Sequence, residues 1–196
     1  MTEFILASAS PRRLELLRTI EIEPWVIPAE CDEDYGNLTV PEDIVKELSK
    51  RKAESVYSNL PAKAGTYVIG ADTLVYCSGE ILGKPKDQED AERMLRLISG
   101  GTHEVTTGVT IIKTDRTGLH NSTVTFSETS KVTVYPISNE EIRDYISTGE
   151  PMDKAGSYAI QGIFSKFIKG IVGDYTNIVG LPLGHLYDAL KKMEHS

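Results

Sequence analysis

The stretch Ile5-Leu-Ala-Ser-Ala-Ser-Pro-Arg-Arg-Leu-Glu-Leu-Leu17 decides how we expect the N-terminal part of the chain to fold. Phe4 to Ala7 is a short apolar run, which is typical of a buried strand. The small residues 8–10 let a backbone approach a ligand. Pro11 suits the first turn of a helix, where its missing N–H costs nothing. The leucines that follow give this helix an apolar side. The stretch therefore predicts a strand, a tight turn and a helix N-terminus.

This turn also has the chemistry of an anion-binding site. A helix N-terminus presents free backbone N–H groups and partial positive charge. Ser8 and Ser10 add hydroxyl donors, and Arg12 and Arg13 can each bind phosphate oxygens with two N–H groups. An arginine pair on a helix is also typical of a solvated face. Two cations are unfavourable at the positive end of a helix dipole unless an anion is bound, so we favour the phosphate interpretation.

Composition limits the class of protein. The chain has 196 residues, 40% of them hydrophobic and 26% charged, which is ordinary for a soluble globular domain. Its net charge of −8 argues against general binding to nucleic acid or to an anionic membrane, because a basic surface supplies the affinity for both. We see no signal peptide, no apolar run as long as a membrane span, and no metal-ligand spacing between Cys31 and Cys77. We therefore expect a cytoplasmic protein with reduced thiols and a small anionic ligand.

The rest of the chain predicts a mixture of strands and helices. Strands are expected over 23–28, 67–76, 80–82, 105–113, 124–135 and 164–172, and residues 150–162 are turn-rich and then strand-like. Helices are expected after a capping box at Thr39, after an Asp87 cap, after a capping box at Ser138, and from Leu183 onward. Strict alternation of strand and helix is absent. We therefore predict an α/β or α+β fold with a mixed sheet, in which about 85–150 forms a smaller lobe beside a cleft.

Carboxylates stand at two places where they could do chemistry. Asp72 interrupts the most apolar strand, and a carboxylate in a buried strand is costly unless it is paired or binds a metal. We favour a functional role for Asp72 over a buried structural ion pair. The acidic loop over residues 30–34, which contains Glu33, is equally compatible with a solvated turn and with a metal or base site.

Three other side chains are candidates for ligand contact. Lys52 is nearly one helical turn beyond Leu48, so we expect it close to the buried face of its helix. Lys84 lies between a glycine and a proline and could point into a cleft from a fixed loop. Gln161 offers a donor and an acceptor that could read a base edge, although a glutamine on the outside of a strand is the ordinary alternative.

The run from Leu6 to Arg13 resembles the opening signature of the Maf family of nucleoside triphosphate pyrophosphatases. Further motifs of that family follow in the same order and at similar spacing over essentially the whole chain: Asp32-Glu33, Lys52-Ala53, Gly70-Ala-Asp-Thr73, Gly83-Lys-Pro85, Asp153-Lys-Ala-Gly156, Ile160-Gln-Gly162 and Val179-Gly-Leu-Pro182. The resemblance implies a single Maf-like domain over 1–196. Its implied fold is α/β and ITPase-like: a mixed, twisted sheet with flanking helices and two lobes around a deep cleft. It also implies a homodimer.

The resemblance further implies a reaction. A nucleoside triphosphate is hydrolysed between its α and β phosphates, giving a monophosphate and pyrophosphate, with Mg²⁺ or Mn²⁺ as the cation. Family members are viewed as house-cleaning enzymes and are linked to control of septum formation. Carried over to this chain, Asp72 is the proton acceptor, Asp72 and Glu33 hold the metal, and the triphosphate is held by Ser8, Arg12, Arg13, Lys52 and the catalytic Lys84. Whether Asp72 is a base or only a metal ligand stays open.

The resemblance also implies a substrate branch. Arg12, Thr73 and Gln161 occupy the positions taken as specificity determinants, as in the branch that acts on dTTP and UTP. The 7-methyl-GTP branch tends to carry Trp, Gln and Glu there. Gln161 can match the O4 acceptor and N3–H donor that uracil and thymine share. Modified pyrimidine nucleotides fit the same pattern.

Three alternatives compete with this interpretation. The chain could be a septation regulator that binds a nucleotide without turnover, although its intact Asp72, Glu33 and Lys84 argue against this. It could bind nucleic acid through its arginine pair, against which stands the net charge of −8. It could also be a phosphatase that removes the terminal phosphate, which only product analysis distinguishes.

Overall fold

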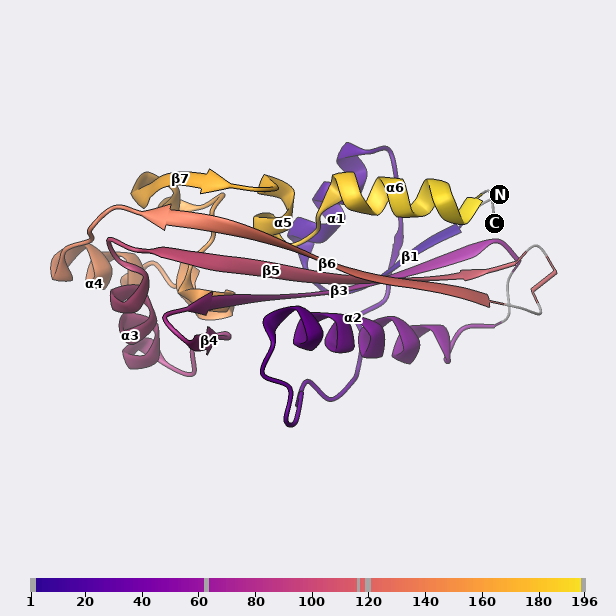
Figure 1. The fold of residues 1–196 in the computed structure, drawn as a ribbon, viewed down its shortest axis with the longest axis horizontal. Helices are drawn as coiled ribbons and strands as arrows, with labels where there is room; N and C mark the ends of the chain where they lie inside the picture. Colours follow the sequence, from indigo (N-terminus) through magenta and orange to yellow (C-terminus); the bar gives the residue numbers. More distant parts are fainter. Residues whose placement is uncertain (1–2, 62–63, 116, 119–120, 195–196) are drawn as a thin grey trace. The chain divides into compact units, whose positions relative to one another are not determined.

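A computed structural model describes residues 3–61, 64–115, 117–118 and 121–194 (Figure 1). The described chain forms a seven-stranded mixed sheet in the order β2-β1-β3-β5-β6-β7, and β4 pairs with β3. The strands are β1 (Glu3–Ala7), β2 (Trp25–Val26), β3 (Thr66–Cys77), β4 (Glu80–Leu82), β5 (Thr102–Thr114), β6 (Asn121–Val134) and β7 (Ile168–Val172). The helices are α1 (Pro11–Thr19), α2 (Pro41–Tyr57), α3 (Gln88–Ile98), α4 (Asn139–Ser147), α5 (Tyr175–Val179) and α6 (Leu183–Glu194). The predicted mixed α/β sheet with flanking helices is confirmed.

The chain divides into two compact units. Unit 1 comprises residues 1–72, 107–128 and 180–196, and unit 2 comprises 73–106 and 129–179. Strands β3, β5 and β6 contribute residues to both units. No helix in the described ranges combines the length and the apolar character that crossing a membrane requires.

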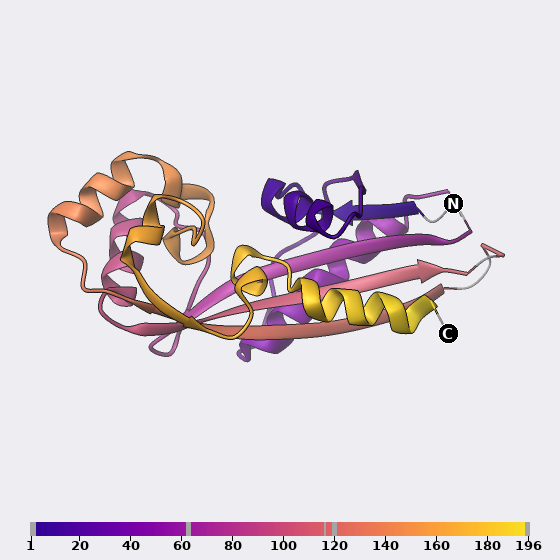
Figure 2. The same ribbon diagram turned by 90° about the horizontal axis from the view of Figure 1, so that it is seen from above.

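In unit 1, the predicted strand–turn–helix at the N-terminus is confirmed. Strand β1 runs parallel to β3, with Ile5 opposite Val68 and Ala7 opposite Gly70. Residues 5–8 are buried. Helix α2 lies along one face of these strands, and α1 and α6 lie on the opposite face (Figures 1 and 2). Both faces of the central strands are thus covered, which explains their almost continuous apolar sequence.

Two glycines let the backbone of α2 contact the sheet directly. A Cβ at Gly70 on β3 would lie 2.4 Å from the carbonyl oxygen of Ser49, and one at Gly108 on β5 would lie 2.2 Å from that of Val45. Ordinary contact begins at 3.4 Å, so no side chain fits at either position without moving the helix. At these two points α2 therefore packs with its backbone directly against the sheet.

Unit 2 has a core of its own, centred on aromatic side chains. Phe164 is fully buried, and its ring centroid lies 4.7 Å from that of Tyr158 and 5.3 Å from that of Tyr145. Helices α3 and α4 pack against each other beside this cluster. Their predicted caps are confirmed: Asp87 accepts from the Asp90 N–H at 2.8 Å, and Ser138 forms a reciprocal capping box with Glu141.

The predicted capping box at Thr39 is wrong. Helix α2 begins at Pro41, and its N-cap is Val40, which makes no side-chain capping bond. Proline forces the residue before it into an extended conformation, so the boundary falls at Val40 and Thr39 lies one residue too early to cap.

Two predicted strands are also corrected. The strand-like part of 150–162 is absent from that described segment, which forms 3₁₀ turns over Glu150–Asp153 and Ala155–Ser157. The strand expected over 164–172 begins only at Ile168, because Ile163–Phe167 is another 3₁₀ turn. Side chains three residues apart eclipse in a 3₁₀ helix, and this spacing buries both Phe164 and Phe167.

Candidate functional site

Three of the predicted site residues form one charged cluster in unit 1. The Lys52 ammonium lies 2.6 Å from Asp72 Oδ1 and 2.7 Å from Glu33 Oε1. The Lys52 and Asp72 side chains are only 13% and 14% exposed, whereas that of Glu33 is 60% exposed. A lysine and an aspartate that are distant in sequence therefore meet in a largely desolvated position.

The packing of α2 on β3 creates this cluster. Gly70 faces α2 and contacts the backbone of Ser49 and Ala53. Asp72 is two residues further along β3, so its side chain points to the same face of the sheet. Lys52 directly precedes Ala53, which contacts Gly70, so its side chain lies beside that of Asp72. Its expected place near the buried face of α2 is confirmed.

The carboxylates decide the charge state of Lys52. Burial by itself lowers the pKa of this ammonium, but the opposing attraction of Asp72, with hydrogen bonds to Asp72 and Glu33, raises the pKa above its usual value. Lys52 is consequently a permanent cation at neutral pH.

The N-terminal turn holds the arginine pair Arg12-Arg13. Helix α1 begins at Pro11, so Arg12 and Arg13 lie in its first turn, which contains no acidic residue. Arg13 donates from Nη1 to Ser8 Oγ at 3.0 Å and from Nε to the Gly180 carbonyl at 2.9 Å. The predicted placement of both arginines at a helix N-terminus is confirmed.

Arg13 also belongs electrostatically to the Lys52 cluster. Burial lowers the pKa of the Arg13 guanidinium, and the negative charge of Asp72 opposes this effect. Arg12 and Glu33 act on the same group. Unit 1 thus gathers six of the nine predicted site residues around one region: Ser8, Arg12, Arg13, Glu33, Lys52 and Asp72.

A residue that sequence reasoning missed holds the acidic loop in place. Arg51 donates from Nη1 to the Asp34 carbonyl at 2.6 Å and from Nε to Glu47 at 2.8 Å. Within the loop, the Asp34 N–H donates to Asp32 at 2.9 Å. The neighbouring backbone of Glu33 is therefore tied to α2. The only sequence signal was the spacing of Glu47 and Arg51, which is that of an ordinary surface pair.

Three predicted site residues belong to unit 2. Thr73 follows Asp72 on β3 and is half-buried, whereas Lys84 and Gln161 are exposed. The loop that carries Lys84 is anchored at Gly83, whose carbonyl accepts from the Gly156 N–H at 3.0 Å. The segment that carries Gln161 is a turn closed by a bond from the Gly162 N–H to the Ala159 carbonyl at 3.2 Å. Gln161 thus lies in a turn, and the alternative that placed it on the outside of a strand is wrong.

The residues present fit a divalent cation in one respect. Asp72 and Glu33 direct carboxylate oxygens at the same positive charge, that of Lys52. Mg²⁺ is usually held by one or two carboxylates together with substrate phosphates, so two carboxylates suffice. A cluster of three or more His, Cys, Asp or Glu side chains able to hold a metal is absent from the described part of the chain.

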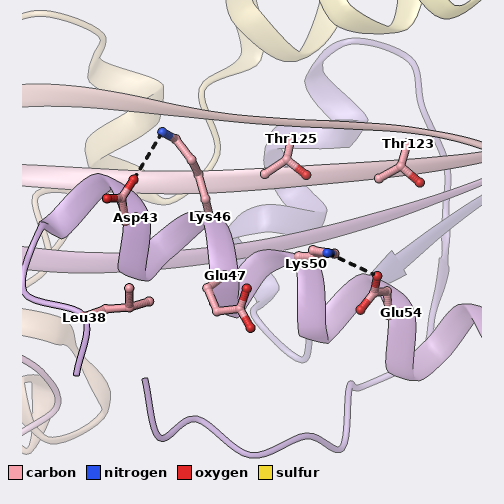
Figure 3. Close-up of a pocket in the computed structure, with 8 residues that line it drawn as sticks. All are labelled: Leu38, Asp43, Lys46, Glu47, Lys50, Glu54, Thr123 and Thr125. Atoms are coloured by element: carbon pink, nitrogen blue, oxygen red, sulfur yellow. Dashed lines mark ion pairs between the residues drawn. The ribbon is translucent and has the colours of Figure 1, made fainter. Parts of the chain in front are cut away.

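A separate groove in unit 1 runs between α2 and β6 (Figure 3). It has a volume of about 680 Å³ and is lined by Leu38, Asp43, Lys46, Glu47, Lys50, Glu54, Thr123 and Thr125. Lys46 pairs with Asp43 and Lys50 pairs with Glu54, as the dashed lines show. The lysines of the groove are thus neutralised from within α2, and none of the predicted site residues lines it.

Comparisons with known proteins agree with the resemblance. Residues 3–193 match the family model described as Maf, Maf-like protein. A protein of Agathobacter rectalis named dTTP/UTP pyrophosphatase is 50% identical, over 98% of this chain and 98% of that protein. Proteins with the same name are 47% identical in Koribacter versatilis (96% of this chain, 93% of that one) and 44% identical in Bacillus cereus (99% and 97%).

A solved structure shows a more distant similarity. The Staphylococcus aureus Ham1 protein matches 68% of this chain and 72% of its own, with 17% sequence identity and a TM-score of 0.43. The sequence match to the family model spans nearly the whole chain, and the relatives are similar along their whole length. The chain therefore belongs to the Maf family.

Proposed function

We propose that this chain is a dTTP/UTP pyrophosphatase, which hydrolyses these nucleotides to the monophosphate and pyrophosphate. The names of relatives that are 44–50% identical over nearly the full length support this substrate class. The observation that carries the proposal is the cluster of Lys52, Asp72 and Glu33 beside the arginine turn. Fixed cations next to converging carboxylates suit the hydrolysis of a polyphosphate.

The triphosphate binds at the arginine turn in this proposal. The N-terminus of α1 offers backbone N–H groups, and Arg12 and Arg13 supply two cations there. Arg13 is held by Ser8 and by the Gly180 carbonyl, so its guanidinium is already oriented. Lys52 and Lys84 add charge that balances the leaving pyrophosphate, which lowers the barrier most when these groups are positioned beforehand.

Asp72 accepts a proton from the attacking water. The bond from Lys52 fixes its carboxylate, and its low exposure limits competition from solvent. Mg²⁺ or Mn²⁺, held by Asp72 and Glu33 together with phosphate oxygens, would neutralise charge on the reacting phosphates. The base is read by Gln161, with Thr73 and Arg12 as the other specificity positions. A homodimer, a cytoplasmic location and a link to septum formation remain predictions from the family resemblance.

Product analysis tests the proposal. Purified protein with Mg²⁺ or Mn²⁺ is given dTTP, UTP, CTP, dCTP, GTP, ATP and 7-methyl-GTP. We expect pyrophosphate with dTMP and UMP. Pyrophosphate chiefly from 7-methyl-GTP would overturn the assignment of Arg12, Thr73 and Gln161, and orthophosphate with nucleoside diphosphates would overturn the reaction itself.

The variant Asp72→Asn separates an enzyme from a regulator. We expect turnover to be lost while nucleotide binding, measured by calorimetry, largely persists. Asp188→Asn is the matched control, because Asp188 is an exposed carboxylate on α6 that pairs only with the nearby Lys192 among the ion pairs of the described residues. Wild-type protein that binds nucleotide without turnover would favour the regulator.

A further inference from the structure

Glu150 joins two parts of unit 2 through both of its carboxylate oxygens. Tyr145, on α4, donates its hydroxyl to Oε1 at 2.9 Å, and the backbone N–H of Ile163 donates to Oε2 at 3.0 Å. Burial raises the pKa of the Tyr145 hydroxyl, and Glu150 raises it further, so this hydroxyl donates throughout the physiological pH range. One side chain thus fastens the segment around residue 163 to a buried tyrosine.

The carboxylate also explains the glycine at position 162. A Cβ at Gly162 would lie 2.2 Å from Glu150 Oε1 and 2.5 Å from Oε2. The backbone of Gly162 has an ordinary φ of −96°, so conformational freedom is not the reason for glycine here. The missing side chain is what lets the carboxylate lie against the chain directly after Gln161.

The other end of the same turn is fixed as well. The hydroxyl of Tyr158 lies 2.8 Å from Nε2 of His103, and both side chains are buried. Between these anchors the Gly162 N–H closes the turn onto the Ala159 carbonyl at 3.2 Å. Gln161 is itself exposed, so its main chain fixes the point from which its side chain extends.

We infer that Glu150 is a positioning residue for base recognition: it holds the main chain that carries Gln161. This inference rests on the proposed function and extends it to a residue whose carboxylate oxygens both accept from groups of the protein itself. An amide that must present a donor to O4 and an acceptor to N3–H discriminates only if its backbone is fixed, since a misplaced amide loses both bonds. Loosening the turn should therefore reduce the preference for UTP over CTP, whose 4-amino group reverses the hydrogen-bonding pattern.

The test compares kcat/KM for UTP and CTP in variants of the whole protein. For Glu150→Ala we expect the UTP/CTP ratio to fall at least fivefold. Glu150→Gln should keep the ratio within twofold of wild type, because its amide oxygen can accept from Ile163 and its NH₂ can donate to the Tyr145 oxygen. Glu140→Ala, which removes an exposed carboxylate on α4, is the charge-matched control and should leave the ratio unchanged.

A second pair of variants tests the same contact from the other side. Gly162→Ala should lower the ratio as Glu150→Ala does, because its methyl group displaces the carboxylate. The double variant should be no worse than either single variant, since residues in contact are not additive. Tyr145→Phe removes the hydroxyl that donates to Glu150 and that also interacts with the backbone of Ala159, in the same turn, so it should lower the ratio at least twofold. This variant decides the question should Glu150→Ala fail to fold.

The outcomes separate this inference from the proposed function. If the wild-type protein forms no dTMP from dTTP and no UMP from UTP, the proposed function is refuted. Wild-type activity with a UTP/CTP ratio that changes in Gln161→Ala, but not in Glu150→Ala or Tyr145→Phe, would refute the inference alone. Equal loss on both nucleotides in the Glu150 variants would show a purely structural role and would also overturn it. In a Gln161→Ala background, we expect Glu150→Ala to produce no further change in the ratio.

Discussion

The variant Gly70→Ala tests whether the α2–β3 contact creates the charged cluster. The added Cβ would lie 2.4 Å from the Ser49 carbonyl oxygen and 2.6 Å from the Ala53 nitrogen, both of them backbone atoms of α2. Ordinary contact begins at 3.4 Å, so the helix must retreat by about 1 Å. Lys52 retreats with it, whereas Asp72 stays on the strand.

The magnitudes follow from this displacement. Overpacking of a tightly packed site destabilises a protein by about 1–3 kcal/mol, and we expect a loss in that range. The Lys52–Asp72 separation of 2.6 Å would grow beyond hydrogen-bonding distance. A misplacement of about 1 Å at a catalytic group costs on the order of 10²-fold in rate, so kcat/KM for UTP should fall to that extent.

Urea denaturation measures the stability of these variants, and pyrophosphate release measures their activity. Gly184→Ala on α6 is the control, because a Cβ there meets open space and should raise stability slightly. Gly108→Ala forces the same helix outward at Val45, roughly two turns from Lys52, and should lose stability with a smaller loss of activity. Wild-type stability and kcat/KM within twofold in Gly70→Ala would refute the reasoning.

Three further outcomes are expected. Burial lowers the pKa of His103 from 6.5 to about 4, so the unfolded chain binds a proton more readily than the folded one. The free energy of unfolding should therefore fall by about 3 kcal/mol from pH 7 to pH 4. Urea denaturation at several pH values should show a smaller fall in His103→Gln, and an equal fall in both proteins would contradict this. Arg51→Ala should raise the Mn²⁺ concentration for half-maximal turnover about tenfold, because it releases the loop that carries Glu33, and an unchanged titration would exclude that role. Ser138→Ala should cost about 1 kcal/mol in urea denaturation, whereas Thr39→Ala should change stability by less than about 0.5 kcal/mol; equal effects would contradict the assigned caps.

The local sequence is sufficient to predict an element where the interactions that form it join residues close along the chain. The Phe4–Ala7 strand, the helix begun by Pro11 and the Ser138 cap all depend on contacts within a few residues, and all were predicted. The start of α2 is set at the same scale, because Pro41 holds Val40 in an extended conformation and so overrides the capping pattern at Thr39. Local patterns also indicated the candidate site residues Arg12, Arg13 and Asp72, and the family motifs supplied their roles.

Contacts between distant segments decided the rest. A sequence does not reveal that the backbone of α2 packs against Gly70 and Gly108. It also does not reveal that this packing places Lys52 in an ion pair with Asp72. The hydrogen bonds of Arg51 to the acidic loop and of Glu150 to the segment after Gln161 also join parts of the chain that are distant in sequence. Hydrophobic spacing indicates which face of an element is buried, but the partner of a given polar atom depends on where the elements pack. The strand expected over 164–172 accordingly gives way, over residues 164–167, to a 3₁₀ turn that buries Phe164 and Phe167.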